Sequence, residues 1–84
     1  MYALVYRKSV VKSLTKLPND VCGKFTAAFQ QLASGDSAQF NIKKLSGRDG
    51  FRLRIGGYRA IYRIHNDQLI IEVLAVGSRG DIYK

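Results

Sequence analysis

The sequence predicts an α+β fold, a single mainly antiparallel sheet with a helical hairpin packed on one face. Three observations predict it: a β-prone segment comes first, two segments of helical apolar spacing follow, and the second half alternates with period two. The 84 residues suffice for one domain, which we place over residues 1–84.

The first half of the chain predicts one strand and two helices. The segment YALVY, residues 2–6, is short and rich in β-formers, which favours a first strand. Ser9 is a candidate cap for a helix that ends before Pro18, and the polar residues just after Pro18 can cap a second helix. Gly35 is a natural stop for that second helix. Because the connection is so short, we expect an α-hairpin.

The second half of the chain predicts three strands. Residues 51–55 alternate apolar side chains with arginines, and residues 56–57, a Gly-Gly pair, suit a two-residue hairpin turn. The next strand covers residues 58–65 and reaches a second turn at residues 66–67. The apolar segment QLIIEVLAV, residues 68–76, is typical of a strand inside the sheet. The predicted order is β-α-α-β-β-β.

The first hairpin register divides its side chains between two faces. With the turn at residues 56–57, Arg54 lies opposite Arg59 and Arg52 lies opposite Ile61. Like charges that face each other across strands destabilise a sheet, and the helices can cover only the apolar face. We therefore expect an open arginine face, whose members are Arg52, Arg54, Arg59 and Arg63.

The second turn extends this register to the last strand. It places Ile64 opposite Leu69, Tyr62 opposite Ile71 and Ala60 opposite Val73. Glu72 then falls on the arginine face, diagonal to Arg59 and Arg63, where one carboxylate balances only part of the charge. Because arginine donors form a fork that matches phosphate, we interpret this face as an anion-binding surface rather than an ordinary solvated one.

The overall charge also favours an anionic partner. Fourteen Lys and Arg against six Asp and Glu give a net charge of +8, and residues 43–63 contain seven basic residues and one acid, Asp49. Nucleic acid and acidic proteins are the partner classes that such a balance indicates. The single cysteine, Cys22, lies on the apolar helix stripe and cannot form an internal disulfide, so we expect a cytoplasmic protein.

The segments KKLSGRDGFRLRIGGYRAIYRI and LIIEVLAVGSRGDIYK together resemble the RelE/ParE superfamily of toxins from type II toxin–antitoxin systems, and more closely its RelE branch. The resemblance implies an endoribonuclease that needs neither metal nor cofactor and cuts mRNA in the ribosomal A site. There the 2′-hydroxyl attacks the phosphate to leave a 2′,3′-cyclic phosphate. It also implies an antitoxin with an acidic segment, a monomeric free toxin and a hetero-oligomer with the antitoxin.

The resemblance also implies which residues act. The basic pair before the hairpin falls on Arg52 and Arg54, the arginine after it on Arg59, and the two C-terminal positions on Arg79 and Tyr83. Cations placed beside a phosphate stabilise the charge that develops on its oxygens. Tyr83 is the candidate base, and Arg79 or Arg52 the candidate proton donor. Because arginine holds its proton tightly, we expect charge stabilisation to contribute more than proton transfer.

Several alternatives stay open. Tyr83 could instead cover a sheet edge, and Arg79 could pair with Asp81. His65 is interpreted as a solvated turn residue, and no metal-ligand cluster is visible in the sequence. We expect contacts to the RNA backbone, rather than catalysis, from four further basic residues: Lys43, Lys44, Arg48 and Arg63.

Two other functions compete with RNA cleavage. A ParE-like toxin would inhibit DNA gyrase on the same fold, and a non-catalytic member would only bind an antitoxin. In each case the acidic antitoxin segment is expected to lie across Arg52, Arg54 and Arg59, or to displace residues 79–83.

Overall fold

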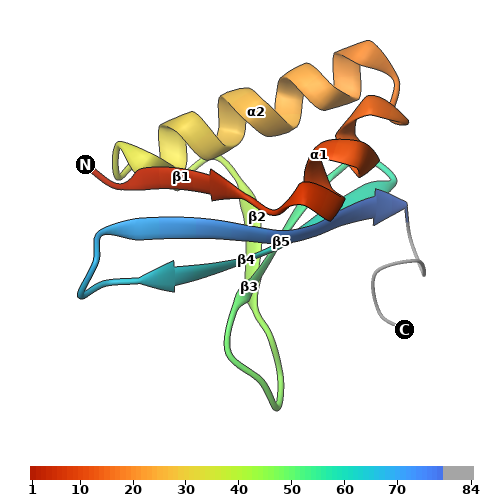
Figure 1. Ribbon diagram of the computed structural model, residues 1–84. Coiled ribbons are helices and arrows are strands. Elements are labelled where there is room, and N and C mark those ends of the chain that lie inside the picture. Colours follow the sequence, from red (N-terminus) through yellow and green to blue (C-terminus); the bar gives the residue numbers. More distant parts are fainter. Residues whose placement is uncertain (79–84) are drawn as a thin grey trace.

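The structure, a computed structural model, describes residues 1–78 and contains a five-stranded sheet with both helices on one face (Figure 1). The strand order is β1-β5-β4-β3-β2, with β1 parallel to β5 and every other pair antiparallel. The α+β fold predicted from the sequence is confirmed. The elements are β1 (Ala3–Tyr6), α1 (Lys8–Thr15), α2 (Asn19–Ala33), β2 (Asn41–Lys44), β3 (Phe51–Ile55), β4 (Tyr58–His65) and β5 (Ile70–Ser78).

The helix ends agree with the predictions in part. Helix α1 begins at Lys8 with Arg7 at its N-cap, so the prediction that Ser9 caps it was wrong. Helix α2 begins at Asn19 with Pro18 at its N-cap, so the prediction that a polar residue after Pro18 caps it was wrong. Proline suits this position because it has no N–H that would remain without a partner. Gly35 adopts a φ of 92° two residues after α2 ends, which confirms it as the helix stop.

Strand β2 was not predicted. Its sequence, NIKK, has one apolar residue in four, and so it shows no alternation to detect. It lies at the edge of the sheet and pairs with β3, placing Lys43 opposite Arg52. Short, lysine-bearing edge strands are common because their charge discourages pairing with another chain.

The register of the β3–β4 hairpin is the predicted one. Arg54 lies opposite Arg59, and Leu53 lies opposite Ala60. Gly56 opens the two-residue turn with a φ of 58°, a value that glycine adopts without strain. Leu53 and Ala60 are fully buried, which fixes the opposite, arginine-bearing side of the hairpin toward the open face.

The predicted register of β4 with β5 was wrong by two residues. Ile64 lies opposite Ile71 and Tyr62 opposite Val73, because the turn spans residues 66–69 instead of two residues, with Leu69 at a φ of 54°. A shift of two residues preserves the alternation of side chains, so the predicted apolar residues still face the helices.

A β-bulge shifts the register again further along. The pairing changes between Ile61 and Tyr62, so that Ala60 lies opposite Val76 rather than Val73, and Leu74 becomes the extra residue of β5. Bulges increase the local twist of a strand and redirect side chains. This bulge therefore brings Leu74 and its neighbour Ala75 beside the arginine face.

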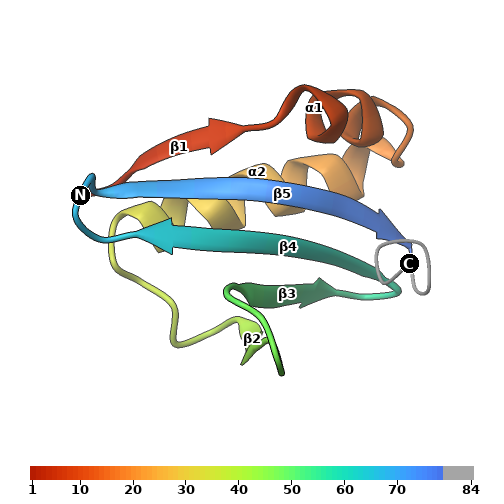
Figure 2. The same cartoon turned by 60° about the horizontal axis from the view of Figure 1, so that its bottom comes forward.

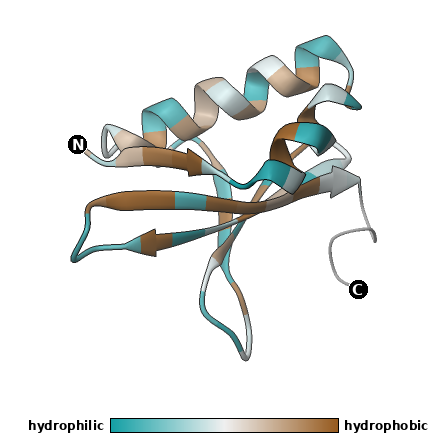
Figure 3. Cartoon of the chain, viewed as in Figure 1, coloured by the Kyte–Doolittle hydropathy of each residue, from teal (hydrophilic) through white to brown (hydrophobic). Residues whose placement is uncertain are grey.

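The core fills the space between helices and sheet. Phe25 and Phe29 of α2 are fully buried, and Figure 3 shows apolar segments of the helices turned toward the sheet. The Phe29 ring meets Tyr62 edge to face, with centroids 5.5 Å apart. Burial raises the pKa of Tyr62 to about 12, which agrees with the covered face predicted for this tyrosine and excludes it as a base near neutral pH.

We predict that Gly50→Ala destabilises the protein more than Gly47→Ala. Both glycines have a positive φ, which is 129° for Gly50 and 75° for Gly47. A Cβ on Gly50 would lie 3.0 Å from the Tyr62 carbonyl oxygen, whereas a Cβ on Gly47 would have no atom within 4 Å. The free energy of unfolding should fall by about 3 kcal/mol for Gly50→Ala and about 1 kcal/mol for Gly47→Ala. Urea unfolding of both variants measures this, and equal losses would contradict the steric explanation.

Candidate nucleic-acid interface

The side of the sheet away from the helices carries two cross-strand pairs of like charge. Arg54 of β3 lies opposite Arg59 of β4, and Lys43 of β2 lies opposite Arg52 of β3. Figure 2 shows this side of β2, β3 and β4. The predicted arginine face is therefore extended by one lysine. These pairs concentrate positive charge on the open side of the sheet, which suits an anionic ligand with forked acceptor groups.

The hairpin itself holds one of these side chains. Arg54 is exposed, and its Nε donates to the carbonyl oxygen of Gly56 at 3.3 Å. Arg52 and Arg59 are partly buried. The side chain of Arg54 is thus directed along its own turn, at the end of the sheet where β4 begins, and its terminal guanidinium nitrogens remain as donors.

The residues predicted to contact RNA lie in or near the two like-charge pairs. Lys43, Lys44, Arg48 and Arg52 line a cavity of about 400 Å³ between β2 and the start of the β2–β3 loop. Arg63 lies further along β4, with its Nε 3.5 Å from Asp49 Oδ2. Arg48 lines the cavity beside β2 and, together with Arg63, a second hollow. Arg48 therefore links the predicted RNA-contacting residues of β2 to Arg63.

Glu72 lies on the open side, but it binds other residues than those predicted. It is directly opposite Arg63, so the prediction that it lies diagonal to both Arg59 and Arg63 was wrong. His65 Nε2 lies 3.0 Å from one carboxylate oxygen, and Arg7 Nε donates to the other at 3.1 Å. These hydrogen bonds, that of His65 first, lower the pKa of Glu72.

The sequence analysis missed the roles of Arg7 and His65. His65 ends β4 half-buried and bound to Glu72, rather than solvated in a turn. The signal that could have indicated these roles was Glu72, a lone acid in an apolar strand. A carboxylate in such a strand requires a cation or hydrogen-bond donor nearby. The parallel pairing of β1 with β5, which brings Arg7 close, is not specified by any local pattern.

Arg79 and Tyr83 lie outside the described residues, so their predicted roles remain predictions. Within residues 1–78 no three His, Cys, Asp or Glu side chains lie close enough together to hold a metal ion. No helix in the same part of the chain is long and apolar enough to cross a membrane.

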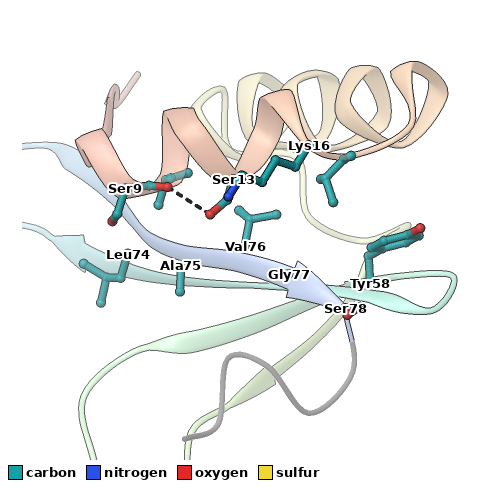
Figure 4. Close-up of a pocket in the computed structure, with 11 residues that line it drawn as sticks. Ser9, Ser13, Lys16, Tyr58, Leu74, Ala75, Val76, Gly77 and Ser78 are labelled. Carbon is teal, nitrogen blue, oxygen red and sulfur yellow. Dashed lines mark hydrogen bonds between the residues drawn. The ribbon is translucent and has the colours of Figure 1, made fainter.

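Another cavity of the described structure lies elsewhere, on the helix side. It measures about 650 Å³ and runs between α1 and the end of β5, where Lys16 contributes the one charged side chain among its lining residues (Figure 4). The arginines instead occupy an open surface with smaller hollows. Such a surface suits an extended anion better than a small enclosed ligand.

These features define a class: a small α+β protein whose open sheet face is suited to an extended anion. The sequence model of the family described as "ParE toxin of type II toxin-antitoxin system, parDE" matches residues 4–83. An Escherichia coli protein described as a RelE-like toxin is 31% identical over 98% of this chain and 90% of its own length.

Solved structures agree with these relatives. The archaeal RelE–RelB complex from Pyrococcus horikoshii contains a chain with 30% identity and a TM-score of 0.78, matched over 95% of this chain and 97% of that chain. The isolated E. coli RelE toxin has 23% identity and a TM-score of 0.78, over 99% of this chain and 92% of its own, and shows the shared fold. The chain belongs to the RelE/ParE superfamily of type II toxin–antitoxin toxins.

We predict that Glu72→Gln loses stability at neutral pH and much less in acid. The lowered pKa of Glu72 means that its stabilising contribution is complete above the ordinary value of 4.5 and disappears as the pH falls through the lowered value. The difference in urea midpoint between wild type and variant should therefore shrink below pH 4.5. Asp67→Asn, which changes an exposed carboxylate, is the control, and a pH-independent difference for Glu72→Gln would contradict the account.

Proposed function

We propose that this protein is an endoribonuclease that cuts mRNA on the ribosome without a metal ion, and that it acts in the cytoplasm. The observation that carries the proposal is the block of two like-charge pairs, Arg54 with Arg59 and Lys43 with Arg52, on the open face. An RNA backbone carries closely spaced negative charges, which are complementary to this concentration of positive charge. Membership of the toxin family supports the same function.

The proposed reaction is a transfer within the RNA strand. The 2′-oxygen attacks the adjacent phosphorus, the bond to the 5′-oxygen breaks, and the products carry a 2′,3′-cyclic phosphate and a 5′-hydroxyl. Negative charge grows on the nonbridging oxygens, where Arg54 and Arg59 are proposed to bind. Both lie at the turn end of the hairpin, and β5 passes beside Arg59 at Gly77.

The proton transfers are assigned to the C-terminal residues. Tyr83 is proposed to accept the 2′-hydroxyl proton, and Arg79 or Arg52 to supply a proton to the departing 5′-oxygen. Gly77, opposite Arg59, comes two residues before Arg79, so the chain leaves β5 close to the proposed cleavage cluster. Because arginine releases a proton reluctantly, most of the rate enhancement is attributed to charge stabilisation.

The proposed partners follow from the same surface. Structural neighbours include RelE–RelB complexes, in which a toxin is bound to an antitoxin. An antitoxin with an acidic segment is proposed to lie across Arg52, Arg54 and Arg59, or to displace residues 79–83, and so to block the site. The free toxin is proposed to be a monomer. Unchanged antitoxin affinity after Arg59→Glu would contradict the first placement.

We predict that Arg59→Ala slows cleavage of ribosome-bound mRNA about 10²-fold, the cost of losing one donor to a developing oxyanion. Purified protein is added to ribosomes carrying a labelled mRNA, in parallel with naked RNA in EDTA. Lys24→Ala, which removes one exposed positive charge from α2, is the control and should cleave at the wild-type rate. Wild-type activity in Arg59→Ala would contradict the assigned role.

The second candidate function is inhibition of DNA gyrase. The match of residues 4–83 to the family described as ParE toxins favours it, since the resemblance associates ParE with gyrase. A comparison of DNA supercoiling with mRNA cleavage on ribosomes distinguishes the two functions. Blocked supercoiling together with intact mRNA on ribosomes would establish the gyrase function, and with it the Arg54→Ala and Tyr83→Phe variants should remain toxic.

A further inference from the structure

A second hollow on the open side, the basic cavity, contains arginines from three separate elements. It measures about 240 Å³. Arg7 lies between β1 and α1, Arg48 comes from the β2–β3 loop and Arg63 from β4. The loop projects from the open side of the sheet in Figure 1. The other lining residues are Asp49, Ile61, Leu74 and Ala75.

Three of the other four residues that line the basic cavity are apolar. Ile61 points toward the open side yet is only 3% exposed. Leu74 and Ala75 lie side by side because the bulge places an extra residue in β5. An apolar patch beside three guanidinium groups suits a ligand that joins a flat apolar group to an anion. A volume of about 240 Å³ is below the ~300 Å³ typical of small-molecule pockets, so one small unit of a longer ligand fits best.

Arg63 is incompletely satisfied in this cavity. Its Nε is shielded from solvent and has no hydrogen-bond partner among residues 1–78. Asp49 Oδ2 lies 3.5 Å away, too far and too exposed, at 75%, to be a strong partner. A buried donor without a partner is costly, so a ligand oxygen that reaches Arg63 replaces a weak contact by a stronger one.

The side chain of Arg7 is held in place by Glu72. Its Nε donates to Glu72, whose other oxygen is held by His65. A guanidinium group bound through Nε still presents its terminal nitrogens. Because the Glu72 contacts orient the side chain before any ligand arrives, less conformational freedom is lost on binding.

We propose that the basic cavity binds one nucleotide of a single-stranded RNA, with a phosphate at Arg63 and Arg7 and the base against Ile61, Leu74 and Ala75. This inference rests on the proposed function, because it takes RNA as the ligand. Arg63 is four residues from Arg59 along β4, about 13 Å at the usual rise of a strand. The cavity is thus a separate subsite beside the cleavage cluster, and Asp49 competes with the RNA for Arg63.

RNA is favoured over an acidic peptide because a nucleotide carries a base next to its phosphate, and the weakly polar face of a base gains from burial against aliphatic side chains. An aspartate or glutamate side chain offers a carboxylate without that group. The apolar part of the basic cavity would then have no function. Charge alone does not distinguish the two ligands, so both are used as probes.

The test measures the binding of a fluorescent single-stranded RNA, fully 2′-O-methylated so that it cannot be cut, by anisotropy. Arg63→Ala should weaken binding about tenfold, the effect of one charge-assisted contact. Lys24→Ala removes the same charge from an exposed position of α2 and should have a much smaller effect. Asp49→Asn should strengthen binding, which shows that the effects do not come from misfolding.

Equal losses in Arg63→Ala and Lys24→Ala, or unchanged affinity in Asp49→Asn, would overturn the subsite. So would an equal loss for Arg63→Ala with a fluorescent poly-aspartate peptide, because that result would identify an acidic protein as the ligand. The methylated RNA separates this inference from the proposed function. Specific binding without cleavage of ordinary mRNA would refute only the nuclease, whereas cleavage with no effect of Arg63→Ala would refute only the subsite.

Discussion

The rest of this structure depends on one constraint, which is that the buried core places Arg54 of β3 directly opposite Arg59 of β4. The two lie directly opposite each other because Leu53 and Ala60, one position away on each strand, are fully buried against the helices. A slip of one residue would bury the arginines and expose the apolar side chains. The core therefore enforces a like-charge pair that local electrostatics disfavours, and it presents that pair on a face the helices leave open.

Two irregular features turn this open face from a flat surface into a hollowed one. The bulge opposite Ile61 gives β5 an extra residue, and the β2–β3 loop carries Arg48 and Asp49 over the same area. Arg48 lines both basic hollows, one beside β2 and one beside β4. The cationic residues are thus spread along the open face instead of gathered at a single point, which suits an extended polyanion.

Sequence reasoning predicted the elements with strong periodicity and missed those defined by long-range pairing. The register of the β3–β4 hairpin was predicted correctly because the Gly-Gly turn and the alternation of apolar residues with arginines indicate the same pairing. Strand β2 has too few apolar residues to be detected, and the second turn was misplaced because Leu69 with positive φ lengthens it. The roles of Arg7 and His65 depend on Glu72 contacts across three strands, which no local pattern encodes.

The central claim is that the arginine face promotes attack by a ribose 2′-hydroxyl on the next phosphate. The most direct test places a single 2′-deoxy nucleotide at the cleaved position of a ribosome-bound mRNA and compares it with the all-ribose strand. We expect the substitution to abolish cleavage at that bond, while the all-ribose strand yields a 2′,3′-cyclic phosphate and a 5′-hydroxyl. Cleavage at the deoxy position, or a 5′-phosphate on the product, would contradict the account.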